Sequence, residues 1–114
     1  MKPLFPEVGF ETFASLDMRV GRIIDVEPFP KARRPAWKLT LDLGELGTRR
    51  TSAQITHYPV EDLTGRLVVA AVNLGSKEIA GFSSECLVLA AIGDDGLARL
   101  LRPDDGVVPG DRVA

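Results

Sequence analysis

The cations able to contact phosphate groups concentrate in one stretch of the chain. This stretch carries a proline-bounded basic loop and the two strands expected after it, with Lys31, Arg33, Arg34, Lys38, Arg49 and Arg50. Small β-barrels bind single-stranded or looped nucleic acid through such a face and its flanking loops. The formal net charge is only −2, so phosphate binding must come from this local patch rather than from the whole molecule. The alternative is a solvated basic edge, offset by Glu27, Asp42 and Glu45.

Residues that could support catalysis or hold a metal are few. His57 is the only histidine and Cys86 the only cysteine, which excludes multi-histidine and cysteine-cluster metal sites and an internal disulfide. We interpret His57 as a loop residue and Cys86 as a small buried apolar residue. The pairs Asp94-Asp95 and Asp104-Asp105 stand beside glycines, where aspartate favours turns. We therefore expect no enzyme activity, no catalytic residues, no metal and no cofactor.

The elements that must position the cations are mostly strands. The clearest runs from Trp37 to Leu43, where apolar residues alternate with polar ones. From Met18 the period is also two, and it predicts one face with Met18, Val20, Ile24 and Val26 and an opposite face with Arg19, Gly21, Ile23 and Asp25. Further strands are expected over 48–52 and 97–101, with an extended segment at the end of the chain. Together they predict an all-β, five-stranded barrel with a short N-terminal helix and C-terminal strand extensions.

Two further patterns predict a second copy of the chain as a partner. Phe10, Phe13 and Leu16 share one face of an expected helix over about 10–15, and another short helix is expected over 60–63. The continuous apolar runs 67–72 and 86–92 predict strands covered on both faces, although a small barrel covers only one. We therefore expect a homodimer with Phe10, Phe13 and Leu16 in its interface.

The length of 114 residues predicts one domain, with 1–16 as a helical dimerisation segment and 17–114 as barrel and C-terminal extension. The first residues lack the continuous apolar stretch of a signal peptide. The longest apolar run is too short to cross a bilayer. These features predict a cytoplasmic protein without membrane insertion.

Three segments resemble the tRNA-binding domain family, namely Asp17–Ile23, Val69–Leu74 and Ala80–Leu89. Their order and spacing match across about 17–113, and the resemblance implies an OB-fold. Within the family, Pro30–Leu39 and Ser52–Thr56 are most similar to the export-related chaperones of the CsaA type. Synthetase-type domains usually have Ser-Gly where this chain has Ser52-Ala53.

The resemblance implies a binding protein with one of two ligands. The first is tRNA. The resemblance places Lys31, Arg33, Arg49, Asn73, Ser84 and Glu85 on the binding face, and the basic patch adds Arg34 and Lys38. We predict all of these except Glu85 to bind nucleic acid. The alternative is an unfolded preprotein held in an apolar cleft of Phe29, Trp37, Ile55 and Phe82. Asn73 and Ser84 could instead cap strand ends through backbone groups, and Phe82, in an expected loop, could instead pack against its own barrel. Glu85 is expected to organise that loop.

Overall fold

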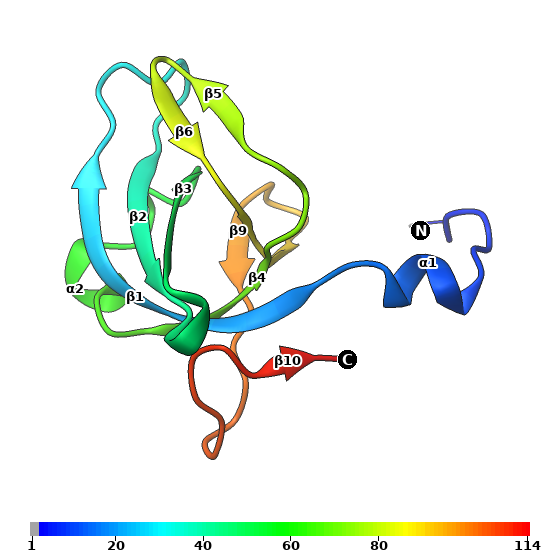
Figure 1. Cartoon of the computed structure of the whole chain (residues 1–114). Coiled ribbons are helices and arrows are strands. Elements are labelled where there is room, and N and C mark those ends of the chain that lie inside the picture. Colours follow the sequence, from blue (N-terminus) through cyan, green and yellow to red (C-terminus); the bar gives the residue numbers. More distant parts are fainter. Residues whose placement is uncertain (1–2) are drawn as a thin grey trace.

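The computed structural model describes residues 3–114 and is built around one curved antiparallel sheet (Figure 1). The strand order is β3-β2-β1-β4-β7, with β3 (Thr48–Ala53), β2 (Trp37–Asp42), β1 (Met18–Pro28), β4 (Leu67–Ala71) and β7 (Leu87–Val88). The short C-terminal strand β10 (Arg112–Val113) pairs with the beginning of β1. The sheet curls far enough for residues 84–86 to approach β3, where the Glu85 amide donates to the Arg50 carbonyl over 2.8 Å. The sheet is thus nearly closed, which confirms the predicted all-β OB-type barrel.

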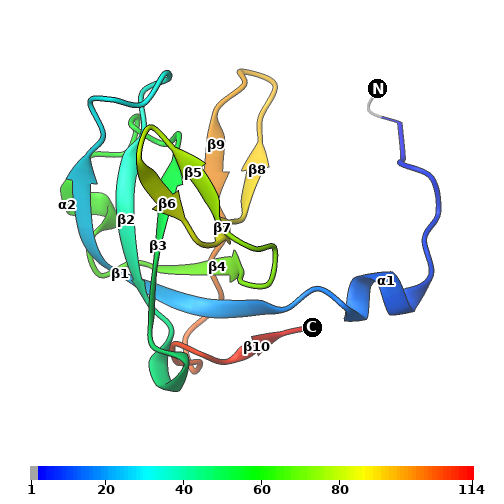
Figure 2. The same cartoon turned by 45° about the horizontal axis from the view of Figure 1, so that its top comes forward.

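Two hairpins and three short helical segments complete the fold (Figure 2). The hairpins are β5 (Lys77–Ile79) with β6 (Phe82–Ser84), and β8 (Ala90–Ile92) with β9 (Ala98–Leu100). The helical segments are α1 (Phe10–Ala14), α2 (Val60–Leu63) and the 3-10 helix η1 (Gly44–Leu46). No helix within residues 3–114 combines the length and apolar character needed to span a membrane.

The barrel interior is filled by the strand that the sequence showed most clearly. Leu39 and Leu41 of β2 and the following Leu43 are 0–1% exposed, as their alternation predicted. They pack with apolar residues from the neighbouring elements, including Leu63 and Val68. The main core therefore sits inside the curved sheet, and a second, smaller cluster of Met18, Val69 and Ala71 lies on the opposite face.

The predicted faces of β1 are wrong beyond its first half. Ile23 is 0% exposed inside the barrel, whereas Ile24 is 47% exposed. The pairing of β1 with β2 shifts between Ile23 and Asp25, as in a β-bulge. One extra residue turns the rest of a strand over, so Val26 again packs against the core. Arg22, a charged residue between Val20 and Ile24 on the predicted apolar face, is exposed and lies just before this bulge.

The apolar run 86–92 is not one strand covered on both faces. Leu87 and Val88 pair with β4, whereas 90–92 leave the main sheet and pair with β9. Within the single chain Leu87 and Ile92 are 52% and 61% exposed. The other run, 67–72, is covered as predicted, with Val68 to Val72 all buried.

The hairpin β5–β6 stands where the sequence indicated only a loop. Its turn consists of Ala80 and Gly81, which both have positive φ, +49° and +81°. Two consecutive positive φ angles define the type I′ turn that matches the twist of a hairpin. Asparagine or aspartate before glycine is the usual sequence signal of such a turn. Alanine stands there in this chain, so the sequence did not predict the hairpin. Phe82, the first residue of β6, is therefore buried in a strand rather than exposed in a loop.

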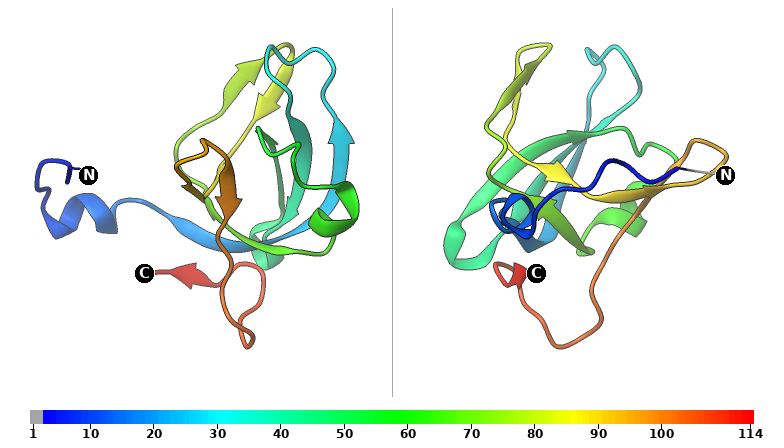
Figure 3. Two further views of the ribbon diagram at one scale, coloured as in Figure 1. Left: turned by 180° about the vertical axis from the view of Figure 1, so that it is seen from behind. Right: turned by 90° about the vertical axis from the view of Figure 1, so that its right-hand side faces the viewer.

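The N-terminal arm, residues 3–16, extends away from the barrel (Figures 1 and 3). None of the residues of α1 is buried, and Phe10 is 78% exposed. Leu16, at the root of the arm, packs against the cluster of Met18, Val69 and Ala71. The arm thus joins the barrel at Leu16, while its aromatic side chains face solvent.

Candidate nucleic-acid interface

The loop 29–36 and the hairpin β5–β6 lie side by side at one end of the barrel (Figures 1 and 2). Between them is a surface depression, here called the arginine pocket, lined by residues that include Arg33, Arg34, Ser52, Gln54 and Lys77. Its one acidic lining residue is Glu78. The structure thus brings together two of the predicted phosphate-binding arginines and adds Lys77, which sequence reasoning missed because the hairpin was not anticipated.

A second depression, here called the aromatic pocket, lies beside the arginine pocket. It is lined by Phe29, Pro30, Lys31, Lys38, Arg50, Ala80, Gly81 and Phe82, with three cations and no carboxylate. The rings of Phe29 and Phe82 meet edge to face, with centroids 5.4 Å apart. Lys38 Nζ lies 4.9 Å from the Phe29 centroid, and the Arg50 guanidinium lies 4.8 Å from that of Phe82. Members of one apolar cluster line both pockets, which together form the basic end of the barrel.

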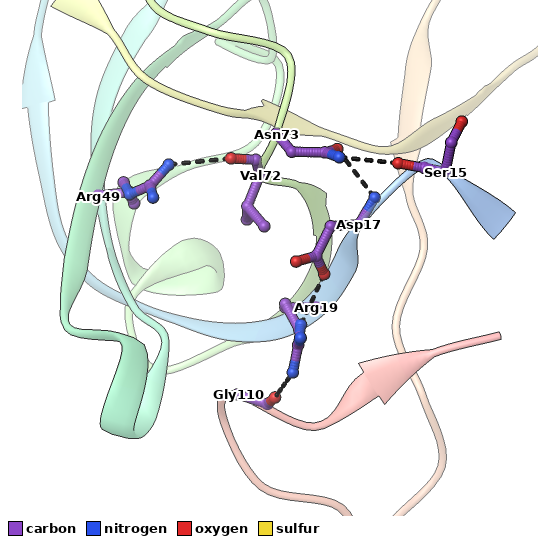
Figure 4. Close-up of polar contacts among 7 residues, drawn as sticks. All are labelled: Ser15, Asp17, Arg19, Arg49, Val72, Asn73 and Gly110. Atoms are coloured by element: carbon purple, nitrogen blue, oxygen red, sulfur yellow. Dashed lines mark hydrogen bonds and ion pairs between the residues drawn. The ribbon is translucent and has the colours of Figure 1, made fainter.

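Arg49 and Arg50 are neighbours in sequence but lie on opposite faces of β3. Arg49 pairs with the buried Leu41. Its guanidinium donates to the Val72 carbonyl over 3.0 Å (Figure 4) and to the Glu85 carbonyl over 3.4 Å. Arg50 pairs with Thr40 on the outer face, and thus lies with Lys38. Arg49 therefore lines neither basic pocket, whereas Arg50 lines the aromatic pocket. The strand register reveals this, because side chains alternate between faces.

Asn73 joins the root of the N-terminal arm to the end of β4 (Figure 4). Its side-chain oxygen accepts from the Asp17 amide, and its side-chain nitrogen donates to the Ser15 carbonyl, each over 2.8 Å. Arg19 continues this set of contacts by binding the Asp17 carboxylate and the Gly110 carbonyl. Both ends of the Asn73 side-chain amide thus bind backbone groups of the chain, which agrees with the alternative interpretation of Asn73 as a residue that caps the end of a strand.

Ser84 and Glu85 close the barrel against β3. The Ser84 hydroxyl accepts from the Ser52 amide over 3.2 Å and lies 3.2 Å from the hydroxyl of the buried Thr51. The Glu85 carboxylate accepts from the Arg50 amide over 2.8 Å. Glu85 therefore organises its segment as expected, and it does so through the backbone that carries Arg50.

The four residues predicted for peptide binding do not line one cleft. Phe29 and Phe82 belong to the aromatic pocket, whereas Trp37 is half-buried against the core with its indole N–H donating to the Tyr58 carbonyl. Ile55 is buried but lines a separate groove of about 500 Å³, which we call the apolar groove. The groove lies between the end of β3 and the hairpin β8–β9, and its lining includes Leu87, Ile92, Leu97 and Leu100.

The residues that could have supported catalysis have local partners. The His57 ring contacts the Ala98 carbonyl over 2.8 Å on the surface. Asp95 accepts from the Leu97 amide and from Arg99, whose hydrogen bonds hold the pKa of the Asp95 carboxyl well below its usual range. Burial raises the pKa of the Cys86 thiol from 9.0 to about 11, so it is protonated at neutral pH. Asp95 is thus a turn residue, and Cys86 is a buried apolar side chain.

Comparison with known proteins identifies relatives along almost the whole chain. The family model of the tRNA binding domain matches residues 18–112. Methionine–tRNA ligase 1 of Sorangium cellulosum is 42% identical over 113 residues, which are 98% of this chain but only 16% of the ligase. The chain thus spans about a sixth of the length of the curated relatives it matches.

Solved structures of the same length are also similar. The CsaA chaperone protein of Picrophilus torridus is 43% identical with a TM-score of 0.90, covering 95% of this chain and all of that one. The CsaA chaperone of Bacillus anthracis has the same identity and TM-score and covers 96% of this chain and all of its own. The fold, the family match and these relatives agree, and the chain belongs to the tRNA binding domain family.

Proposed function

We propose that this protein is a non-catalytic binding protein that holds tRNA through the basic end of its barrel. The single observation that carries the proposal is the convergence of Lys31, Arg33, Arg34, Lys38, Arg50 and Lys77 on two adjoining pockets. Three carboxylates lie near them: Glu78 lines the arginine pocket, Glu27 pairs with the Arg50 guanidinium, and Glu85 accepts from the Arg50 amide. Phosphate contacts by such cations position RNA without reading its sequence.

Membership of the tRNA binding domain family supports this ligand, as does the appended domain of methionine–tRNA ligases that the chain resembles. The net charge of −2 gives the molecule no general attraction for RNA. Binding must therefore be local, with the RNA backbone lying across loop 29–36 and the β5–β6 hairpin.

The test is a titration of the purified protein with bulk tRNA at several salt concentrations. Each neutralised phosphate contributes a log–log slope of roughly −0.7 to −0.9. Replacing Arg33 and Arg34 together by alanine should flatten the slope by about 1.5, because two phosphate contacts are lost. Arg102→Ala is the matched control, since Arg102 is exposed at another part of the barrel. An affinity unchanged by the double replacement would refute this site.

We further propose that the working form is a homodimer joined through the N-terminal arm. The arm exposes a series of large apolar side chains: Leu4, Phe5, Val8, Phe10 and Phe13. Exposed apolar patches of this kind mark interaction sites. A second copy is the simplest partner, because it presents the same arm and the same exposed Leu87 and Ile92. Sedimentation that finds only the 12.3 kDa monomer at micromolar concentration would reject the dimer.

A second candidate function is the capture of unfolded polypeptides bound for export, for which the apolar groove provides the specific observation. Its lining includes Ile55, Leu87 and Ile92, and the similar solved chains carry the name of CsaA chaperones. Binding of an unfolded secretory protein should then weaken little with salt, because apolar burial is not screened. Leu97→Ser should reduce that binding and leave tRNA binding intact, because Leu97 lines the groove and is 40% exposed. If binding of the unfolded protein is as sensitive to salt as tRNA binding, both ligands bind at the basic end, and the apolar groove is not the peptide site.

A further inference from the structure

The aromatic pocket differs in construction from a base-stacking platform. Phe29 and Phe82 are only 5% and 7% exposed, and they form a cluster with the buried Ala36. Ala32 and Ile79 pack against this cluster from the loop and the hairpin. A base can stack only on an accessible ring face. These two rings therefore hold the loop and the hairpin together and offer little surface to a base.

The faces of the two rings are occupied by cations. Lys38 Nζ lies 4.9 Å from the Phe29 centroid and 5.2 Å from that of Phe82, so one ammonium group contacts both rings. The guanidinium of Arg50 approaches Phe82 to 4.8 Å. Cation–π contacts within about 6 Å attract the cation to the ring. The rings thus hold two long, flexible side chains close together before any ligand arrives.

The charge of the pocket is unbalanced. Lys38 makes no ion pair among residues 3–114, and the guanidinium of Arg50 pairs with one carboxylate, that of Glu27, over 3.4 Å at the surface. Lys31 lines the same pocket. Two cations that approach the same ring and line one pocket repel each other, and an anion bound between them relieves this repulsion. A compact anion with several acceptor oxygens, such as a phosphate group, is the ligand that suits this arrangement.

We propose that the aromatic pocket binds one phosphate group of an RNA backbone between Lys38 and Arg50, with Phe29 and Phe82 as positioning residues that do not stack on bases. This proposal rests on the proposed tRNA binding and adds that the two cations share one phosphate. The contact is then independent of the base, since phosphate contacts carry no sequence information.

The first test uses the variants Lys38→Ala, Arg50→Ala and their combination in tRNA titrations. Each single variant should weaken binding about fivefold to tenfold, because a shared phosphate loses half of its partners. The double variant should weaken binding only about threefold more, since residues that act on one group are not additive. If the fold-losses in affinity of the two single variants multiply in the double variant, and the double variant changes the salt slope twice as much as each single one, Lys38 and Arg50 do not share one phosphate. Unchanged binding in all three, with a weakened Arg33/Arg34 variant, would overturn the pocket but keep the proposed function.

The second test needs no RNA, so it separates the pocket from the proposed function. Inorganic phosphate should shift the NMR signals of the Gly81 and Phe82 amides in the wild type and in Arg102→Ala. It should leave them unshifted in the Lys38/Arg50 double variant. Uridine, which has a base but no phosphate, should shift none of them. Equal shifts with uridine would indicate stacking and overturn the proposal.

The positioning role of Phe82 is tested by comparing Phe82→Leu with Phe82→Tyr. Leucine fills the apolar cluster but has no ring face, whereas tyrosine keeps the ring. We expect phosphate affinity to fall several-fold in the leucine variant and to return toward wild type in the tyrosine variant. Thermal unfolding checks that both variants are folded. Wild-type phosphate affinity in a folded leucine variant would overturn the positioning role.

Discussion

At the basic end of the barrel, cations lie over the ring faces of two buried phenylalanines, Phe29 and Phe82. Along the arm, the ring centroids of Phe10 and Phe13 are 6.1 Å apart, and no residue of α1 is buried. Both regions are at the surface, and both contain aromatic side chains. The basic end is supported by contacts within the chain, so it is ready to bind a ligand as it stands. The arm lacks such support, and its apolar area calls for a partner. Aromatic side chains therefore have different roles in the two regions: the buried rings of the basic end position cations, whereas the exposed rings of the arm leave an apolar surface uncovered.

The largest expected effect comes from placing a charge on the arm. Phe13→Asp should convert the proposed homodimer to monomers, because a buried unpaired carboxylate costs several kcal/mol. Sedimentation of the variant measures the change. Val60→Asp is the matched control, since Val60 is similarly exposed, 38% against 43%, but lies on α2 at the opposite side of the barrel. Dimers that persist in Phe13→Asp would show that the arm is not the interface.

Arg49 and Arg50 provide a comparison within one strand, because Arg49 binds carbonyls of its own chain whereas Arg50 lines the aromatic pocket. Arg49→Ala removes two hydrogen bonds to the carbonyls of Val72 and Glu85, which should lower the free energy of unfolding by about 2 kcal/mol. Denaturant unfolding measures this loss. The slope of tRNA affinity against salt should stay that of the wild type, because Arg49 is outside both basic pockets. A flatter slope with unchanged stability would return Arg49 to the list of phosphate contacts.

A smaller effect is expected where the arm meets the barrel. Asn73→Ala removes the two hydrogen bonds to Ser15 and Asp17, both near the surface, and should cost about 1 kcal/mol of stability. Thermal unfolding measures this cost, and tRNA binding should be unaffected. If the affinity for tRNA fell tenfold while the unfolding temperature stayed constant, Asn73 would be a ligand contact rather than a link between arm and barrel.

The smallest effect concerns the turn beside the aromatic pocket. Ala80 has a φ of +49°, a conformation that asparagine adopts more readily than alanine. Ala80→Asn should therefore stabilise the protein by up to about 1 kcal/mol and raise the unfolding temperature by about 4 °C. Ala80→Val should do the opposite, because a β-branched residue is strained at positive φ. Stabilisation by valine would contradict the type I′ geometry of this hairpin.

Alternation and turn chemistry were enough to predict most of the fold. The run from Trp37 to Leu43 alternates without interruption, and its leucines are buried as expected. The short helix over Val60–Leu63 and the turn at Asp95 also lie where their sequence signals indicated. These features depend on contacts between residues close in sequence. The basic loop could be recognised for the same reason, since three of its cations lie within four consecutive residues.

Features that depend on pairing between distant segments were decided by the tertiary structure. The bulge after Ile23 is a shift in the register of β1 against β2, and the pattern of residues within β1 alone does not predict it. The sides on which Arg49 and Arg50 lie follow from the pairing of β3 with β2. Phe82 reaches the ring of Phe29 only because the hairpin β5–β6 folds beside the loop.

By itself the sequence determined the barrel class, the position of the basic loop and the apolar character of the arm, because these follow from residue type and local spacing. Only the tertiary structure decided which cations share a pocket and which polar side chains are occupied by the backbone. Asn73 bridges to Ser15 and Asp17, more than fifty residues away, and Ser84 bridges to Ser52. Hydrogen bonds act over about 3 Å in space whatever the separation in sequence, so their partners are known only when the chain is folded.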